Sequence, residues 1–351
     1  MLPRPKRRPL WQRTLLVLGV MFMASWKALR IPTKRLPIEV QKMIRHWHPE
    51  MFRVLIRSWL TRTYIDEPCQ WHVPEPITPK AEVEPAHRLS PEQLDSFYRD
   101  GYLGPFDLLS GDEAERLREE LLALRETQSP HLGIVTDRDR HLDSHTLRDL
   151  LVRPEITDRV AQLLGPDLLC WRSQFFYKPP GGRPIEWHQE STFLSEDYIE
   201  PAIHPPDLDE LFQLTVWIAF DSIEPENGAL HFIPGSQDRI RTIRFGGESS
   251  FYHVNFSLEF DHDPSKVATM SAEPGQFFIF TGRMIHGSGP NHTDRARLAY
   301  NFRVVPTHVP AHTDRDHHHA MHMGQIFDLD HWGVMVIRGE DRHQLSRPIP
   351  D

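Results

Sequence analysis

Short apolar and aromatic segments, separated by turn sequences, fill residues 168–306 and constrain the fold most. These segments are LLCWRSQFFYK (168–178), LFQLTVWIAF (211–220), ALHFIP (229–234), GQFFIF (275–280) and RLAYNFRVVP (297–306). The connecting sequences PPGG, PENG, PGSQ and SAEPG have the Gly, Pro and Asn residues of tight turns. Successive short strands without intervening helices predict antiparallel sheets. Because strands and helices do not alternate and no Gly-rich phosphate loop occurs, a Rossmann-type nucleotide-binding fold is excluded.

Three amphipathic helices are expected before the strands. The first begins after Ser90, has Pro91 at its first position and ends at Gly101. The second lies in residues 110–126, and the third lies in residues 153–165 and ends at a glycine. Helices followed by an antiparallel β region predict a mainly β, α+β fold with a helical front and a double-stranded β-helix (jelly-roll or cupin) core.

The chain contains two cysteines, Cys69 and Cys170, which are far apart in the sequence. This argues against a disulfide scaffold and against a thiolate metal cluster. We expect both thiols to pack in apolar surroundings and the protein to work in a reducing compartment, the cytoplasm.

Charge divides the chain into two regions. Residues 1–64 contain 14 Lys or Arg and 2 Asp or Glu, whereas the whole chain has a net charge of −9. We therefore predict a basic N-terminal extension and linker over residues 1–85, with 66–87 reading as the linker, and a catalytic domain over residues 86–351.

The N-terminal region has two candidate helices. The apolar run Leu15–Trp26 would span roughly 18 Å as a helix, less than the roughly 30 Å of a hydrocarbon core. Residues 40–64 alternate apolar and basic residues, which suits peripheral contact of residues 1–64 with an anionic membrane. Packing on the catalytic domain or a partner, and secretion, remain alternatives.

A candidate metal site begins at the sequence WHQE. In a strand, residues two apart point to the same side, so His188 and Glu190 would present an imidazole and a carboxylate together. Two His and one carboxylate form the facial triad of non-haem Fe(II) enzymes, and His286 is the second candidate histidine. The pair alone is a weak signal, and a solvent-facing polar pair is the alternative. The His-rich segment 312–323 is expected to be a solvated lid and not a metal site.

Two arginines follow His286 in a predicted strand. Arg297 lies eleven residues after it, and Arg303 lies six further on. A strand arginine directed at the core requires an anion, and the distal carboxylate of 2-oxoglutarate fits a guanidinium.

This order of motifs resembles the phytanoyl-CoA dioxygenase superfamily. Within it, separated blocks from about residue 90 to about residue 340 are similar to the syringomycin-type non-haem iron chlorinases, which act on aliphatic amino acids tethered to carrier proteins. The blocks are GYLGPFDLLS, DRHLD, RPEITDRVAQLLGPDLLCWRSQFFYKPPG, WHQESTF, TVWIAFDSIEPENGALHFIPGSQ and PTHVPAHTDRD. Residues 1–85 show no such resemblance.

The resemblance implies a role for each matching residue. His188, Glu190 and His286 would bind Fe(II), whereas Arg297 and Ser288 would bind the far carboxylate of 2-oxoglutarate. Trp217 would line the cosubstrate pocket, with core packing as its alternative, and Gln174 and Lys178 would face the pocket. Arg303 matches an arginine near the chloride, and we expect it to orient Glu190. We expect Asn227-Gly228 to form a turn.

Glu190 is the departure that decides the predicted chemistry. The chlorinases have a small residue, usually Ala, at this position, and the space admits chloride to the iron. A carboxylate there would ligate iron and repel a halide. We therefore predict an Fe(II)-, 2-oxoglutarate- and O2-dependent hydroxylase that acts on an aliphatic C–H bond in specialised metabolism. Its substrate would be an amino acid or acyl group, free or bound to a carrier protein, and not a nucleic acid. A halogenase and a membrane-associated lipid hydroxylase are the alternatives.

Overall fold

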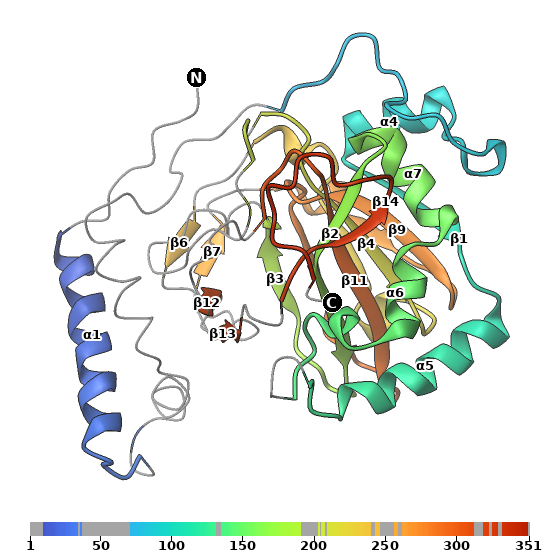
Figure 1. Cartoon of the computed structure of the whole chain (residues 1–351). Helices are drawn as coiled ribbons and strands as arrows, with labels where there is room; N and C mark the ends of the chain where they lie inside the picture. The colour runs from blue at the N-terminus through green and yellow to red at the C-terminus, as the bar shows by residue number, and fades with distance from the viewer. Residues whose placement is uncertain are drawn as a thin grey trace.

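The computed structural model describes residues 10–33, 36, 71–130, 135–190, 203, 205–207, 209–239, 243–245, 256–258, 262–311, 319–322, 325–328 and 332–349. Two antiparallel sheets form the centre of the molecule (Figure 1). The larger sheet has the order β1-β9-β4-β11-β2-β14 among the described strands, and the smaller sheet has the order β3-β10-β5-β8. This is the jelly-roll arrangement that the strand pattern predicts.

The strands of the larger sheet are β1 (Tyr102–Asp107), β2 (Leu168–Lys178), β4 (Leu214–Ala219), β9 (Gln276–Thr281), β11 (Arg297–Pro306) and β14 (Met335–Arg338). The smaller sheet contains β3 (Ile185–His188), β5 (Leu230–Phe232), β8 (Ala268–Met270) and β10 (His286–Ser288). Two hairpins lie outside these sheets: β6 (Ile243–Phe245) with β7 (Phe256–Leu258), and β12 (His319–His322) with β13 (Gln325–Asp328).

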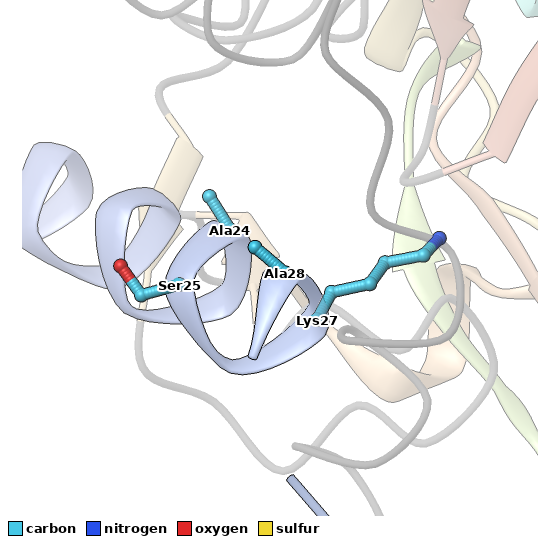
Figure 2. Close-up of a pocket in the computed structure, with 4 residues that line it drawn as sticks. All are labelled: Ala24, Ser25, Lys27 and Ala28. Atoms are coloured by element: carbon cyan, nitrogen blue, oxygen red, sulfur yellow. The ribbon is translucent and has the colours of Figure 1, made fainter. Parts of the chain in front are cut away.

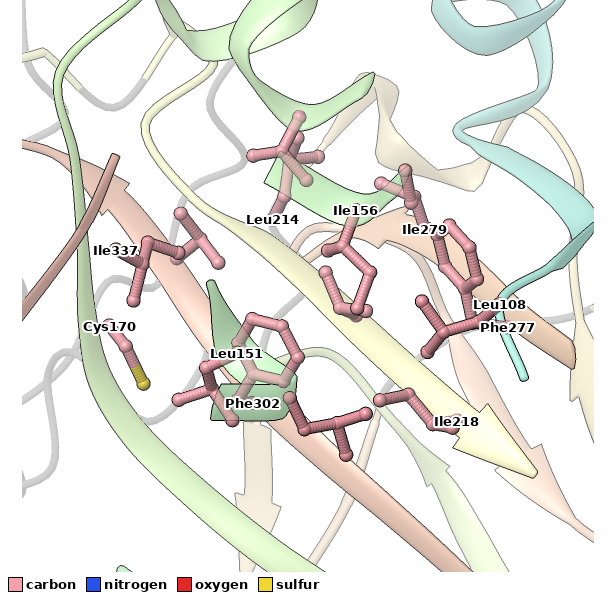
Figure 3. Close-up of a cluster of buried hydrophobic side chains, with 14 of the residues drawn as sticks. Leu108, Leu151, Ile156, Cys170, Leu214, Ile218, Phe277, Ile279, Phe302 and Ile337 are labelled. Atoms are coloured by element: carbon pink, nitrogen blue, oxygen red, sulfur yellow. The ribbon is translucent and has the colours of Figure 1, made fainter. Parts of the chain in front are cut away.

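Helices cover the outer face of the larger sheet. They are α4 (Pro91–Asp100), α5 (Gly111–Arg125), α6 (His145–Leu151) and α7 (Pro154–Leu164). The core between helices and sheet contains Leu151 and Ile156 packed with strand residues such as Ile218 and Phe302 (Figure 3). The inner face of the same sheet meets the smaller sheet through Trp217, among others.

The predicted helix signals are confirmed by the cap geometry. The side chains of Ser90 and Gln93 form a reciprocal capping box at the start of α4, and Gly101 ends this helix with φ 88°. Sequence patterns did not reveal α6 or β1. β1 is a short edge strand that contains Gly104 and Pro105, residues that are depleted in strands.

The segment expected to be a linker packs against the domain over its described part, residues 71–87. Trp71, Ile77 and Ala81 are partly buried against the main core, and the Lys80 N–H donates to the Gln162 carbonyl. The Pro- and Glu-rich composition concealed these few apolar anchors, which hold an extended chain on the surface. The segment ends in a 3₁₀ turn, Pro85–His87, so the expected boundary at residue 85 lies within a packed segment.

The N-terminal apolar run is part of a longer helix, α1 (Leu10–Ala28). None of the described helices is sufficiently long and apolar to cross a membrane. The basic amphipathic segment 40–64 and Cys69 lie outside the described residues, as does most of the His-rich segment 312–323. Cys170 is buried without a disulfide, as expected.

Candidate active site

Two imidazoles meet where β3 and β10 pair. His188 lies directly opposite His286 in the register of these strands, and their ring centroids are 4.1 Å apart. Both side chains are buried. His286 therefore begins a separate strand, β10, and is not part of the apolar strand β9.

Backbone carbonyls fix both rings. Nδ1 of His188 lies 2.8 Å from the Glu186 carbonyl oxygen, and Nδ1 of His286 lies 2.9 Å from that of Met284. When Nδ1 donates these hydrogen bonds, Nε2 carries the lone pair with which imidazole binds a metal. Burial lowers the pKa of His188 to about 3, with His286 as a further cause, and lowers that of His286 to about 4. Both rings are therefore neutral at pH 7, as metal ligands must be.

Glu190 lies two residues beyond His188, just after the end of β3. Its Oε2 atom accepts hydrogen bonds from Thr215 Oγ1 at 2.6 Å and from Gln213 Nε2 at 2.8 Å. Its Oε1 atom lies 3.0 Å from Nε of Arg303 in an ion pair. The carboxylate is thus buried but accepts two hydrogen bonds and forms one ion pair, which offsets the cost of desolvating its charge.

The side chains of His188, His286 and Glu190 form the candidate metal site. Within the described ranges, no group of three or more His, Cys, Asp or Glu side chains is gathered closely enough to hold a metal. The imidazoles of His188 and His286 are adjacent, whereas the Glu190 carboxylate is turned toward Arg303. The donor types nevertheless fit Fe(II), because two neutral imidazoles and an ionised carboxylate form a facial triad. Closure of all three around one ion stays a prediction.

The strand register places the remaining candidates on the inward face of the larger sheet. Arg297 lies opposite Lys178, Asn301 lies opposite both Gln174 and Trp217, and Arg303 lies opposite Thr215. Because residues two apart share a face, Arg297, Asn301 and Arg303 all lie on the face of β11 that is directed at the smaller sheet. All the strand residues of this paragraph except Arg303 have less than a tenth of their surface exposed, and Arg303 is mostly buried.

Two cations share one end of this face. Nζ of Lys178 donates to Ser288 Oγ at 2.7 Å and to the Gly289 carbonyl, while Nη2 of Arg297 donates to the Gly228 carbonyl at 2.6 Å. The Arg297 guanidinium also lies 5.5 Å from the centre of the Trp217 ring. Gly228 has φ 87°, and a Cβ there would lie 2.7 Å from Lys178 Cδ, so this turn requires glycine.

No acidic side chain of the described residues forms a salt bridge with either of these two cations. Burial lowers the pKa of Lys178 to about 7, with the nearby Arg297 as the second cause, and lowers that of Arg297 to about 10. Arg297 Nε is buried without a hydrogen-bond partner. A buried cation is costly unless an anion meets it, so this end of the site fits a carboxylate ligand.

Sequence reasoning missed Gln213, Thr215 and Asn301. Asn301 has a buried Oδ1 atom without a hydrogen-bond partner, and it is the cross-strand neighbour of Gln174. Parity along β4 was the available signal, because Thr215 is two residues before Trp217 and must share its face. Asn227 has the predicted turn role: its side chain bonds Glu224 N and the Ser222 carbonyl.

Comparisons with known proteins agree with this fold. The phytanoyl-CoA dioxygenase (PhyH) family profile matches residues 97–299. A solved structure, "CytC3 with Fe(II) and alpha-ketoglutarate", is 30% identical, covers 75% of this chain and 93% of its own, and superposes with a TM-score of 0.58. That structure confirms the jelly-roll fold.

Two curated relatives are also similar. The "probable alpha-ketoglutarate-dependent hypophosphite dioxygenase" of Stutzerimonas stutzeri is 29% identical over 54% of this chain. The match spans 62% of that relative's length. The "ectoine dioxygenase" of Stutzerimonas stutzeri (strain A1501) is 26% identical over 70% of this chain and 87% of its own.

Proposed function

Because this chain belongs to the phytanoyl-CoA dioxygenase family of Fe(II)- and 2-oxoglutarate-dependent oxygenases, we propose that it hydroxylates an unactivated aliphatic C–H bond. The substrate is an amino acid or acyl group, free or tethered to a carrier protein, in specialised metabolism. The observation that carries the proposal is the buried pair of imidazoles of His188 and His286, with the buried carboxylate of Glu190 two residues after His188 in the chain.

His188, His286 and Glu190 hold the iron in this proposal. The imidazoles would bind the metal through Nε2, since both Nδ1 atoms face carbonyl oxygens, and the Glu190 carboxylate would supply the anionic ligand. Bound iron supplies the oxygen activation that couples decarboxylation of 2-oxoglutarate to oxidation of the substrate.

Arg297, Lys178 and Ser288 bind the distal carboxylate of 2-oxoglutarate. Their support is the pair of buried cations and the hydroxyl that already contacts Lys178. Trp217 packs beside the Arg297 guanidinium and excludes water from it, which strengthens the charge–charge interaction. Gln174 and Asn301 lie between the two charged ends of β11 and are suited to donate to the ligand.

Glu190 favours hydroxylation over halogenation. In the proposed site the Glu190 carboxylate takes the position that a small residue leaves open, and its negative charge repels a second anion. The relatives named for hypophosphite and ectoine also support a small, polar substrate. They do not distinguish a free substrate from a tethered one.

Product analysis tests the proposed reaction. The full chain is incubated with Fe(II), 2-oxoglutarate and candidate aliphatic amino acids or acyl groups, free and carrier-loaded, with chloride and bromide present. We expect a product heavier by one oxygen atom and an equal amount of succinate. A halogenated product, or succinate formation that no candidate substrate increases, would overturn the proposal.

We further propose that α1 attaches the protein to an anionic membrane surface. Trp11, Leu15, Leu18 and Phe22 recur at helical spacing, and each is between 45% and 62% exposed. Residues 1–33 contain seven Lys or Arg and no acid. A hollow on the same helix is lined, among the described residues, by Ala24, Ser25, Lys27 and Ala28 (Figure 2). Apolar residues with basic neighbours suit the headgroup region of anionic lipids.

Vesicle sedimentation tests this attachment. The full chain should sediment with phosphatidylglycerol vesicles at low salt and remain in solution with phosphatidylcholine vesicles. The double variant Leu15→Glu, Leu18→Glu should lose binding, whereas the control Val152→Glu, at an exposed residue of the catalytic domain, should retain it. If the wild-type chain did not sediment with anionic vesicles, the proposal would be contradicted. The alternative of a membrane lipid as the substrate would then lose its support as well.

A further inference from the structure

Arg138 belongs to the inward face of the larger sheet, although it lies outside the named strands. It forms an isolated antiparallel bridge with Gln174 of β2. Backbone hydrogen bonds lie on either side of this pair: the Phe175 N–H donates at 2.8 Å and the Asp139 N–H donates at 2.9 Å. This pattern marks a non-hydrogen-bonded pair, whose side chains lie close together on one face of the sheet. Arg138 and Gln174 therefore point the same way, toward the smaller sheet.

Arg138 is one of three arginines on this part of the face. Arg172 of β2 lies directly opposite Arg303 of β11, and their guanidiniums lie 5.4 and 5.8 Å from the centre of the Trp171 ring. Burial lowers the pKa of Arg172 to about 10. Asp139 opposes this shift, whereas the charges of Arg138 and Arg303 add to it. The three guanidiniums are thus close enough for their charges to interact.

Two carboxylates face these three arginines. Asp139 Oδ2 lies 3.5 Å from Nη2 of Arg172. Glu190 Oε1 lies 3.0 Å from Nε of Arg303. These five side chains together have one positive charge in excess, and an excess of partly desolvated positive charge favours an anionic ligand. Arg138 is half-buried at the edge of the sheet, so a ligand that enters there can reach it.

The anion that suits Arg138 is not the distal carboxylate of the cosubstrate. Gln174, the bridge partner of Arg138, is four residues before Lys178 in β2, which is roughly 13 Å along a strand. The Lys178 ammonium is directed away from Arg138 and donates to Ser288 Oγ and the Gly289 carbonyl. The two cations are therefore placed to bind different anions.

An acceptor for an ammonium group lies in the same row of side chains. Asn301 is the other cross-strand neighbour of Gln174, on the side away from Arg138. Its Oδ1 atom is buried and has no hydrogen-bond partner among the described residues. An amide oxygen accepts hydrogen bonds from N–H groups, and an ammonium group has three of them. The row thus contains a donor for a carboxylate and an acceptor for an amine.

We infer that Arg138, Gln174 and Asn301 bind the carboxylate and the ammonium group of a free amino acid, which is therefore not held as a thioester on a carrier protein. The inference rests on the proposed function, because it selects among the substrates proposed there. Arg138 is the specificity-determining residue: its guanidinium forms a charge-assisted hydrogen bond with a carboxylate but not with a neutral ester or thioester.

Substrate forms that differ only in the carboxyl group test the inference. The full chain with Fe(II) and 2-oxoglutarate is given valine, leucine, isoleucine or 2-aminobutyrate as the free acid, as the methyl ester and loaded on a carrier protein. We expect at least one free acid to increase succinate formation. Its ester and its carrier-loaded form should have a kcat/KM about 100-fold lower, the range of a lost hydrogen bond to a charged group.

Variants of Arg138 locate this preference. Arg138→Gln should raise the KM for the free acid about 10- to 100-fold and reduce the preference for acid over ester, while the KM for 2-oxoglutarate stays unchanged. Arg138→Lys keeps the charge and should retain most of the preference. Arg116→Gln, at an exposed arginine of α5, is the control and should behave as the wild type does. General structural damage would lower turnover of acid and ester alike.

Three results would overturn the inference. They are equal kcat/KM for the free acid and either modified form in the wild type, an unchanged preference in Arg138→Gln, and a weaker affinity of Arg138→Gln for 2-oxoglutarate in place of the substrate. A wild type in which no candidate in any form increases succinate formation would instead refute the proposed function, and this inference with it.

Discussion

Each end of β11 has a buried arginine, and the positive charge is compensated differently at the two ends. Arg303 has the Glu190 carboxylate as an internal anion, which also accepts bonds from Gln213 and Thr215. Arg297 and Lys178 form no salt bridge with an acidic side chain of the described residues, and each donates to neutral oxygens. One end is neutralised by the fold, and the other has a surplus of positive charge.

This difference indicates what each end is for. A surplus of buried charge is unfavourable in the isolated protein and becomes favourable when a ligand of opposite charge arrives. We therefore expect the Arg297 end to bind an external carboxylate, whereas the Arg303 end already contains its own. The similarity to chlorinases supports this difference at the Arg303 end. The chlorinases have a small residue at the position of Glu190, and the small residue leaves space for an external anion.

Of the changes considered, Glu190→Gln should have the largest effect, and it should act on the stability of the apoprotein. The variant keeps the size of the side chain but leaves Arg303 buried without its anion, so the free energy of unfolding should fall by about 3 kcal/mol. Denaturant unfolding of the apoprotein measures this. Glu226→Gln, at an exposed carboxylate, is the control and should change little. Equal stability of Glu190→Gln and wild type would show that the two ends do not differ as described.

Arg297→Gln should weaken 2-oxoglutarate binding and leave the stability of the apoprotein nearly unchanged. Removal of a cation that repels Lys178 should change apoprotein stability by less than about 1 kcal/mol, while 2-oxoglutarate binding should weaken about 100-fold, or about 2.7 kcal/mol. Calorimetry with Mn(II) present measures the affinity, and Arg295→Gln, at an exposed arginine, provides the control. Unchanged affinity would place the 2-oxoglutarate carboxylate elsewhere.

Lys178→Met should weaken 2-oxoglutarate binding by a smaller amount, about 10-fold. The methionine keeps the apolar stem but removes the ammonium group, and Arg297 remains to hold the carboxylate. Lys266→Met, on an exposed turn, should bind as the wild type does. A loss as large as that of Arg297→Gln would show that the two cations act as one unit.

The stability of the apoprotein should also depend on pH through Lys178. Burial lowers the pKa of Lys178 from its usual 10.5 to about 7. Between these values the unfolded chain binds a proton that the folded protein does not, so this lysine makes stability rise with pH across that window. Urea unfolding at pH 7 and pH 9 should show the rise in the wild type relative to Lys178→Met. Parallel behaviour of the two proteins would mean that the lysine is not desolvated.

Much of the fold could be predicted from local sequence. The apolar runs that became β2 and β11 match the strands closely, since turn sequences limit them on both sides. The packed segment 71–87 could not be predicted, because it depends on single anchors such as Trp71 within a Pro- and Glu-rich sequence. The helix α1 is longer than its apolar run because the flanking polar residues are compatible with helix.

The site was partly accessible from the sequence for a similar reason. His188, His286 and Arg297 belong to short motifs, and strand parity aligns Arg303 with Arg297. Gln213 and Thr215 have no motif: their importance arises because β4 places them beside a carboxylate more than twenty residues earlier in the chain. The present orientation of Glu190 toward Arg303 likewise depends on tertiary contacts and not on its spacing from His188.

The central claim is that Glu190 occupies the anion position beside the paired imidazoles and thereby excludes a halide. The most direct test is an anaerobic titration of the wild type and Glu190→Ala with Fe(II) and 2-oxoglutarate, followed by chloride, with the metal-to-ligand charge-transfer band as the signal. We predict a band in the wild type that chloride does not shift, and a chloride-dependent shift in Glu190→Ala. A wild-type band that shifts with chloride, or a Glu190→Ala band that does not, would contradict the claim.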